Sequence, residues 1–211
     1  MVLAPRNVCV ADLNEAILPQ MSGEARQYHS ADRIVQEAGA DPENAEPIPV
    51  EVLRSFQSSS LPPGELNLKV GCPVILLRNL DPSRGLCNGT RMVVTQMRDR
   101  VLEVRLLSGE HKGEIALIPR ISLIPTGATD LTFLLRRHQF PVRLAFALSI
   151  NKAQGQSVKY VGIHLCVPVF THGQLYVALS RATASQNVKI LLSEDMVDSK
   201  TLNVVFNEVL L

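Results

Sequence analysis

The chain has 211 residues and a formal net charge of +1, with 46% hydrophobic and 19% charged residues. This composition is typical of a globular protein and excludes a chain that is disordered throughout. Only 4% of the residues are aromatic and tryptophan is absent, which argues against a recognition surface built on stacked rings. The length predicts one large domain, or one domain that carries a small insertion.

No apolar run reaches the roughly 18 residues that a membrane-spanning helix needs. The N-terminus, MVLAPRN, lacks the basic and apolar regions of a signal peptide. We therefore expect an intracellular protein with no membrane contact. Cys9, Cys72, Cys87 and Cys166 are far apart and form no C-x-x-C motif. This spacing predicts four buried or half-buried reduced thiols and no metal site.

The first third of the chain predicts few regular elements. A short strand at residues 2–5 is followed by a helix, because apolar residues recur at helical spacing between positions 10 and 18. Asn7 is a candidate N-cap for this helix. A proline-rich acidic loop at residues 39–49 and a two-turn helix at residues 50–57 come next, and residues 58–64 form a linker.

From Leu66 the pattern changes to short β-strands. Residues 66–79 are rich in Val, Ile and Leu, and Asn88-Gly89 is a strong two-residue hairpin signal. Further short segments, each bounded by Gly, Pro or Asp, extend to Pro125. This spacing predicts a small β-barrel or a strongly bent sheet.

After Thr126 strands and helices alternate. Residues 140–150 form a nearly continuous apolar run, as expected for a strand in the middle of a parallel sheet. Two more strands, at residues 159–165 and 188–193, flank a helix at residues 171–182, and a closing helix is expected at residues 201–211. The sequence therefore predicts an α/β lobe with the barrel inserted in it or appended to its edge.

The positive charge is concentrated in one segment. Residues 131–193 contain no Asp or Glu, and they hold seven of the chain's 21 basic residues. Such a segment is a candidate surface for phosphates or nucleic acid. The adjacent pair Arg136 and Arg137 lies in it, either as a solvated surface pair or as a phosphate contact.

The strongest candidate site is the loop NKAQGQ, residues 151–156, after the apolar run. Ligands of α/β folds bind at the carboxyl ends of strands. Gly155 would let the backbone approach a ligand closely, and hydrogen-bond donors for phosphate oxygens are available from Ser149, Asn151, Lys152 and Gln154. The alternative is a polar loop with a glycine turn.

Nucleotide binding by the chain alone is not expected, since a P-loop needs a Gly-Lys pair and the sequence has none. Arg181 ends an otherwise apolar helix. It could cap the last carbonyl groups of that helix, or it could reach an interface and neutralise a phosphoryl group during its transfer.

Five segments together resemble the C-terminal half of PIF-family DNA helicases, above all those encoded by Helitron-type transposons. These segments are LAPRNVCVADLNEAIL, YHSADRI, LPPGELNLKVGCPVILLRNLDPSRGLCNGTRMVV, FPVRLAFALSINKAQGQS and HGQLYVALSRAT. The resemblance implies the second RecA-like lobe of a superfamily-one motor, a parallel sheet with flanking helices that carries an inserted Src-homology-type β-barrel. The implied domains are residues 1–67 and 126–211 for the lobe and residues 68–125 for the barrel.

The resemblance also assigns roles to residues. Arg181 is similar to the arginine finger that meets the γ-phosphate of ATP, and Gly155 and Gln156 resemble the loop edge near the nucleotide. A DNA-contacting role is implied for Ser149, Asn151, Lys152 and Gln154 of the loop motif, and for Asn7 in LAPRN.

The resemblance implies a motor half that binds single-stranded DNA and moves 5′ to 3′, with ATP and Mg²⁺ bound only in the intact two-lobe enzyme. The partners would be single-stranded DNA and a first RecA-like lobe that supplies the P-loop. A monomer in the nucleus or mitochondria is expected from the same resemblance. The competing hypothesis is a non-catalytic nucleic-acid-binding module, or a decayed transposon-derived fragment, because the P-loop is missing.

Overall fold

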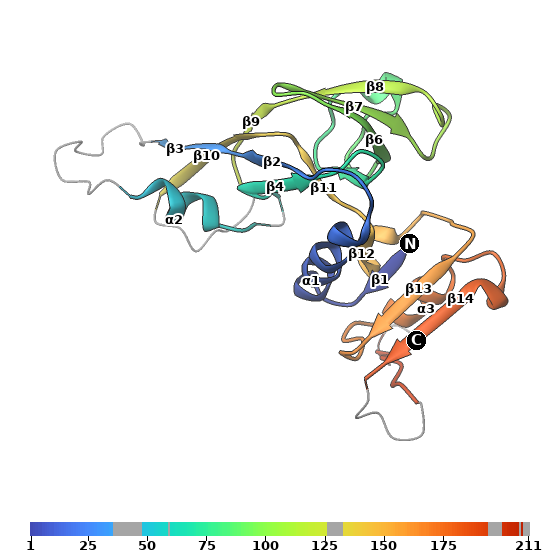
Figure 1. Cartoon of the computed structure of the whole chain (residues 1–211). Coiled ribbons are helices and arrows are strands. Elements are labelled where there is room, and N and C mark those ends of the chain that lie inside the picture. The colour runs from blue at the N-terminus through green and yellow to red at the C-terminus, as the bar shows by residue number, and fades with distance from the viewer. Residues whose placement is uncertain (36–47, 59, 126–132, 194–199, 207, 209–211) are drawn as a thin grey trace. The chain divides into compact units, whose positions relative to one another are not determined.

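The computed structural model describes residues 1–35, 48–58, 60–125, 133–193, 200–206 and 208 (Figure 1). The chain forms an α/β structure with both parallel and antiparallel sheets. It divides into two compact units, residues 1–20 with 145–211 and residues 21–144. No helix in the described part of the chain is long and apolar enough to cross a membrane.

The first unit is built on a parallel sheet with the strand order β12-β1-β13-β14. Its strands are β1 (Val2–Ala4), β12 (Ala147–Ser149), β13 (Val161–Leu165) and β14 (Val188–Leu192). Its helices are α1 (Asn7–Ile17) and α3 (Gln174–Leu179), with short 3-10 turns at η1 (Leu18–Gln20), η3 (Ile150–Ala153) and η4 (Ser185–Asn187). The fully buried Leu3 pairs with Leu148 on one side and Ile163 on the other, so β1 is the buried centre of the sheet.

A buried asparagine ties α1 to the edge of this sheet. Asn14 Nδ2 donates to the carbonyl of Ala147 at 3.1 Å, and Asn14 Oδ1 accepts from Ala147 N at 3.0 Å. Nδ2 also donates to Val10 O at 2.8 Å within the helix. Because β12 has β1 as its one partner among the described strands, the Asn14 amide replaces the strand partner that Ala147 lacks.

The second unit contains antiparallel sheets of five, three and two strands, in the orders β11-β5-β6-β7-β8, β3-β10-β9 and β2-β4. Its elements are β2 (Arg26–His29), β3 (Ala31–Val35), α2 (Val50–Ser55), β4 (Glu65–Leu68), β5 (Pro73–Leu76), η2 (Pro82–Arg84), β6 (Arg91–Met97), β7 (Val101–Leu106), β8 (Ile115–Pro119), β9 (Ile121–Leu123), β10 (Leu134–Gln139) and β11 (Val142–Leu144). Alternate residues of the five-stranded sheet, such as Met92, Val104 and Ile118, are fully buried, which is the period-two pattern of a sheet with one face in a core.

The three-stranded sheet is fixed by a buried ion pair. Arg137 and Asp32 face each other across β10 and β3, and both side chains are fully buried. The guanidinium of Arg137 binds both carboxylate oxygens and also donates to four carbonyl groups of the segment that contains α2, those of Leu53, Arg54, Phe56 and Pro62. These bonds dock α2 and the following linker on one face of the sheet, beside the apolar cluster of Leu53, Leu61, Leu123 and Leu135.

Most of the predicted elements are confirmed. The elements β1, α1, α2, β13, α3 and β14 lie where the sequence patterns place them, and β6, β7 and β8 lie among the short segments predicted up to Pro125. The apolar run at residues 140–150 is a wrong prediction of one central strand. It contains two short strands, β11 paired antiparallel with β5 and β12 paired parallel with β1 at the sheet edge. Apolarity signals burial on both faces and does not specify the partner strand.

Three other local predictions are corrected. The N-cap of α1 is Arg6, and the helix already begins at Asn7. Asn88-Gly89 forms a turn closed by Thr90 N and Cys87 O at 3.0 Å, but this turn lies inside a longer connection between β5 and β6 and is no two-residue hairpin. Residues 201–206, the first part of the closing helix expected at residues 201–211, form no helix, and residues 207 and 209–211 lie outside the described residues. Most of the proline-rich loop, residues 39–47, lies outside the described residues.

The second unit is longer at both ends than the predicted barrel of residues 68–125, because it also includes β2, β3, β10 and β11. The domain boundaries that the sequence predicts, the Src-homology type of the barrel and the identity of the lobe stay predictions.

Candidate nucleic-acid interface

The carboxyl ends of β1 and β12 lie side by side in the first unit. Their parallel register pairs Ala4 with Ser149, so the residues after each strand emerge at the same edge of the sheet. Pro5, Arg6 and the start of α1 follow β1, and the η3 turn follows β12. This is the edge at which α/β folds bind their ligands.

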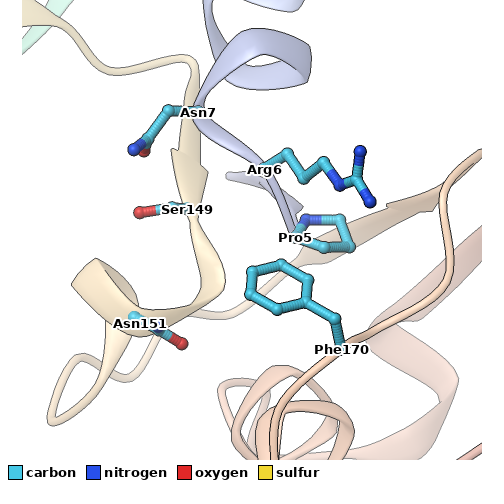
Figure 2. Close-up of a pocket in the computed structure, with 6 residues that line it drawn as sticks. All are labelled: Pro5, Arg6, Asn7, Ser149, Asn151 and Phe170. Atoms are coloured by element: carbon cyan, nitrogen blue, oxygen red, sulfur yellow. The ribbon is translucent and has the colours of Figure 1, made fainter.

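A pocket of about 480 Å³ lies at this edge. It is lined by Pro5, Arg6, Asn7, Ser149, Asn151 and Phe170 (Figure 2). Figure 2 shows the side chains of Asn7 and Ser149 extending in the same direction, and the ring of Phe170 lying next to Pro5. The lining combines two amides, a hydroxyl group and one cation with an aromatic ring, and it contains no carboxylate.

The cation and the ring of this pocket lie close together. The Arg6 guanidinium carbon is 6.0 Å from the centroid of the Phe170 ring, at the outer limit of a cation–π contact. Phe170 is 50% exposed. Its backbone N–H donates to Oε1 of the buried Gln174 at 3.0 Å. Gln174 therefore fixes the segment that presents an open aromatic face to the pocket.

Arg6 also precedes the first turn of α1, whose unpaired N–H groups carry the positive end of the helix dipole. This helix has no acidic residue in its first turn. A phosphate at the pocket would therefore meet one guanidinium group, the amide donors of Asn7 and Asn151 and a favourable helix end.

Arg181 belongs to a second cluster of the first unit. Its Nε donates to Val177 O at 2.9 Å, within α3 and the turn that follows. Its Nη1 donates to the carbonyls of Gln156 at 3.2 Å and Ala153 at 3.4 Å, and its Nη2 donates to Ser180 Oγ at 2.8 Å. The guanidinium caps the end of α3 and joins it to the loop of residues 153–156.

The predicted site residues therefore fall into two groups. Asn7, Ser149 and Asn151 line the pocket. Gly155 and Gln156 lie in the loop that Arg181 holds, and Gly155 has a φ of +78° with open space where a Cβ would point. Lys152 and Gln154 are exposed on the same loop and do not line the pocket.

The charged segment is not one continuous basic surface. Arg137 is fully buried against Asp32, so its predicted alternatives of a solvated pair or a phosphate contact are both wrong. Arg143 donates to the carbonyls of Ser58 and Leu61, and burial, followed by the nearby Arg137 charge, lowers its pKa. Arg137 and Arg143 therefore serve the packing of the second unit. Arg136, in contrast, is exposed.

Pro5, Arg6 and Phe170 line the pocket but were not predicted from the sequence. Arg6 could have been found, because it stands in the same LAPRN segment as Asn7. No sequence motif pointed to Phe170, which reaches the pocket because of the path of the loop after β13. The low aromatic content made a stacking surface improbable, but one exposed ring at the right place does not depend on composition.

The titratable groups outside the pocket include the four thiols, all of which are free. Cys72 is fully buried, and this burial raises its pKa to about 11. Cys166 is exposed, which corrects the prediction of four buried or half-buried thiols. In the described part of the chain, no group of three His, Cys, Asp or Glu side chains could hold a metal ion.

The comparisons with known proteins agree on one family. The family model "DNA helicase Pif1, 2B domain" matches residues 51–97, which lie in the second unit. The chain is 37% identical to the human ATP-dependent DNA helicase PIF1 over 186 residues, which cover 86% of the chain. The chain is homologous to a part of the Pif1 DNA helicases.

Solved Pif1 structures share the fold. Bacteroides Pif1 bound to single-stranded DNA matches the whole chain with a TM-score of 0.69 and 25% identity. Candida albicans Pif1 matches 97% of the chain with a TM-score of 0.67 and 28% identity. The matched regions are 43% and 48% of those two chains and 25% of the human protein. The chain therefore spans about a quarter of its curated Pif1 relative.

Proposed function

We propose that the chain is the C-terminal motor lobe of an ATP-dependent 5′–3′ DNA helicase, which binds single-stranded DNA at the pocket beside the carboxyl ends of β1 and β12. The observation that carries this proposal is the pocket itself. Residues from three separate segments, Arg6 and Asn7, Ser149 and Asn151, and Phe170, meet at the carboxyl ends of two parallel strands. The homology to Pif1 supplies DNA as the class of ligand.

The pocket's chemistry suits a single strand better than a free phosphate. Arg6 and the amide groups of Asn7 and Asn151 can contact phosphate oxygens. The exposed ring of Phe170 can stack on an unpaired base, which is worth about 1–3 kcal/mol per base. A small anion would use the polar groups and leave the ring unused.

We further propose that Arg181 acts as an arginine finger when a first RecA-like lobe with its P-loop is joined to this one. The Arg181 guanidinium binds neutral carbonyl and hydroxyl groups and no carboxylate among the described residues. It could exchange these partners for a phosphate, because a charge-assisted bidentate bond is stronger than a bond to a carbonyl group. Its position at the loop of residues 153–156 would link nucleotide contact to the DNA pocket through η3.

The residues of this chain fit ATP only as half of a site. Arg181 offers one cation, and the open space beside Gly155 allows close approach of a ligand to the backbone. The sequence has no Gly-Lys pair for a P-loop. When bound, ATP with Mg²⁺ would supply the phosphoryl group whose charge Arg181 neutralises, and the remaining ligands would come from the first lobe.

Binding of fluorescein-labelled dT20 to the purified chain, measured by anisotropy at several salt concentrations, tests the DNA site. About three phosphate contacts predict a slope of log K against log salt near −2. Phe170→Ala should weaken binding between fivefold and a hundredfold, which corresponds to about 1–3 kcal/mol. Tyr176→Ala is the matched control, because Tyr176 is 73% exposed and lies outside the pocket. Equal effects of the two substitutions, or no effect of Phe170→Ala, would rule out the pocket as the DNA site.

The capping bonds of Arg181 to the carbonyl groups of Val177 and Gln156 favour a second candidate function, a non-catalytic nucleic-acid-binding module or a decayed fragment. This alternative shares the DNA pocket and gives Arg181 only its capping role. The two proposals differ in one outcome, since only the motor lobe should restore ATP hydrolysis when a P-loop lobe is added.

A further inference from the structure

We propose that the exposed face of the three-stranded sheet β3-β10-β9 in the second unit is a separate contact site for the phosphate backbone of duplex DNA. The choice of DNA as the polyanion rests on the proposed function, whereas the existence of an anion site rests on this face alone. The site consists of Arg33 on β3, Arg136 and His138 on β10, and Ser122 on β9. We call it the basic face.

The first observation is that two arginines are directly opposite each other. The antiparallel register pairs Arg136 with Arg33, and both side chains are exposed. Residues opposite in such a pair have their Cα atoms about 4.5–5.5 Å apart, and like charges at this distance destabilise the sheet. Within the described part of the chain, neither arginine forms a salt bridge with a carboxylate.

The second observation is that this repulsion cannot be relieved by a shift of register. On the opposite face of the same two strands, Arg137 pairs with Asp32 one position away from the Arg136–Arg33 pair. That pair is fully buried and is joined by further bonds to the segment that contains α2. A slip by one residue would exchange the two faces and expose the buried pair. The fold therefore holds two guanidinium groups side by side that no carboxylate of the described residues neutralises.

Neighbouring polar groups extend the basic face across the sheet. His138 is opposite Ala31 on β3 and opposite Ser122 on β9, and His138 Nδ1 lies 3.2 Å from Ser122 Oγ. Both side chains are exposed. Arginines bind phosphate oxygens in bidentate geometry. The Ser122 hydroxyl group and the His138 imidazole can add weaker contacts to neighbouring phosphates of the same DNA strand.

The absence of aromatic residues selects duplex DNA over a single strand. The outward positions of the described strands include no Phe, Tyr or Trp; they are Ala31, Arg33, Val35, Ser122, Leu134, Arg136 and His138. Sites for single strands combine positive charge with rings on which unpaired bases stack. A face that offers cations without aromatic rings suits a ligand whose bases are already stacked inside a helix and whose phosphates form the outer surface.

The test compares the double variant Arg33→Gln/Arg136→Gln with the charge-matched control Arg84→Gln/Arg100→Gln in the full chain. Arg84 and Arg100 are exposed residues of the same unit that lie outside this sheet. Anisotropy with a labelled 30-base-pair duplex is measured at 50 and 200 mM salt. Loss of two phosphate contacts should reduce the slope of log K against log salt by about 1.8. The ratio of wild-type to variant affinity for the duplex should therefore fall about twelvefold between 50 and 200 mM salt. The control should keep the wild-type slope.

Binding of dT20 separates this inference from the proposed function. Arg33→Gln/Arg136→Gln should leave dT20 binding intact, whereas Phe170→Ala should weaken it. Binding of dT20 without any specific loss of duplex binding in the Arg33/Arg136 variant would overturn the basic face alone. Equal losses in the variant and the control would also overturn it, because net charge would then explain the effect. Absence of binding to either DNA would overturn both proposals.

Thermal unfolding of the same variant tests whether it misfolds. Because Arg33 and Arg136 repel each other, Arg33→Gln/Arg136→Gln should unfold at the wild-type temperature or slightly above it. Weaker duplex binding together with unchanged or higher thermal stability supports the basic face. A clearly lower unfolding temperature would show that the two arginines stabilise the sheet, which contradicts the repulsion on which the inference is based.

Discussion

Arg137 in the second unit and Arg181 in the first both lie within residues 131–193, which contain no Asp or Glu. Both side chains donate to several backbone carbonyl groups. Arg137 is fully buried and its charge is neutralised by Asp32. Arg181 is half-buried and binds only neutral groups among the described residues. A basic segment in a sequence therefore does not identify the arginines available to a ligand. Availability depends on whether the fold supplies a carboxylate and excludes water.

The largest expected effect is on the buried pair. Arg137→Met leaves the Asp32 carboxylate buried without its partner, so the free energy of unfolding should fall by about 3–5 kcal/mol. Urea unfolding followed by circular dichroism measures this loss. The double variant Asp32→Leu/Arg137→Met removes both charges and should recover much of it. A loss below about 1 kcal/mol in the single variant would mean that the pair is not buried in solution.

Arg181 should show the opposite balance between stability and activity. In an ATPase restored with a P-loop lobe, Arg181→Ala should lower the rate of hydrolysis by about 10³-fold or more, because an arginine finger neutralises transition-state charge. The same substitution removes bonds to a few partly exposed carbonyl groups, and should cost only about 1 kcal/mol of stability in the isolated chain. Urea unfolding and steady-state hydrolysis give the two values. A rate that changes only as much as the folded fraction would leave Arg181 as a helix cap.

The two arginines also show why part of the fold was predictable and part was not. Strands β13 and β14 and helix α3 follow apolar periods that the sequence displays directly. On β10 the buried positions are Leu135, Arg137 and Gln139, and the exposed ones include Leu134. This strand has no alternation of hydrophobic and polar residues, so no pattern could reveal it before the partners of Arg137 were known.

The candidate site divides in the same way. Asn7 and Ser149 were predicted because each stands in a segment with a recognisable motif, and the parallel pairing of β1 with β12 brings them together. Phe170 lies in a loop without a motif and reaches the pocket only through the fold of the chain. Local patterns identify the polar groups at strand ends, but they do not identify a residue that long-range packing delivers.

Cys72 provides a smaller effect that tests burial in the second unit. Its pKa rises from 9.0 in the unfolded chain to about 11 in the folded one. A raised pKa stabilises the protein fully below pH 9, and this contribution is lost as the pH rises towards 11. The free energy of unfolding should therefore fall by about 2 kcal/mol more in the wild type than in Cys72→Ala over this range. Parallel pH profiles of the two proteins would show that the thiol is accessible to water.

The smallest expected effect concerns the loop that Arg181 holds. Gly155 has a φ of +78° and open space on the side where a Cβ would point, so Gly155→Ala meets only backbone strain. The expected loss of stability is about 1 kcal/mol. Thermal unfolding measures this loss, and Gly109→Ala is a control with a similar φ of +84° and open surroundings in the second unit. If only Gly155→Ala also lowers ATP hydrolysis with the added lobe, this loop approaches the nucleotide.

DNA-stimulated ATP hydrolysis by the purified chain, with and without the P-loop lobe of a Pif1 relative, tests whether this chain is a motor half. We expect no hydrolysis by the chain alone, and hydrolysis that depends on single-stranded DNA and on Arg181 once the lobe is added. Hydrolysis by the chain alone would contradict the assignment of a motor half without a P-loop. Absence of hydrolysis with a folded, DNA-binding lobe present would contradict the motor function and leave the nucleic-acid-binding module.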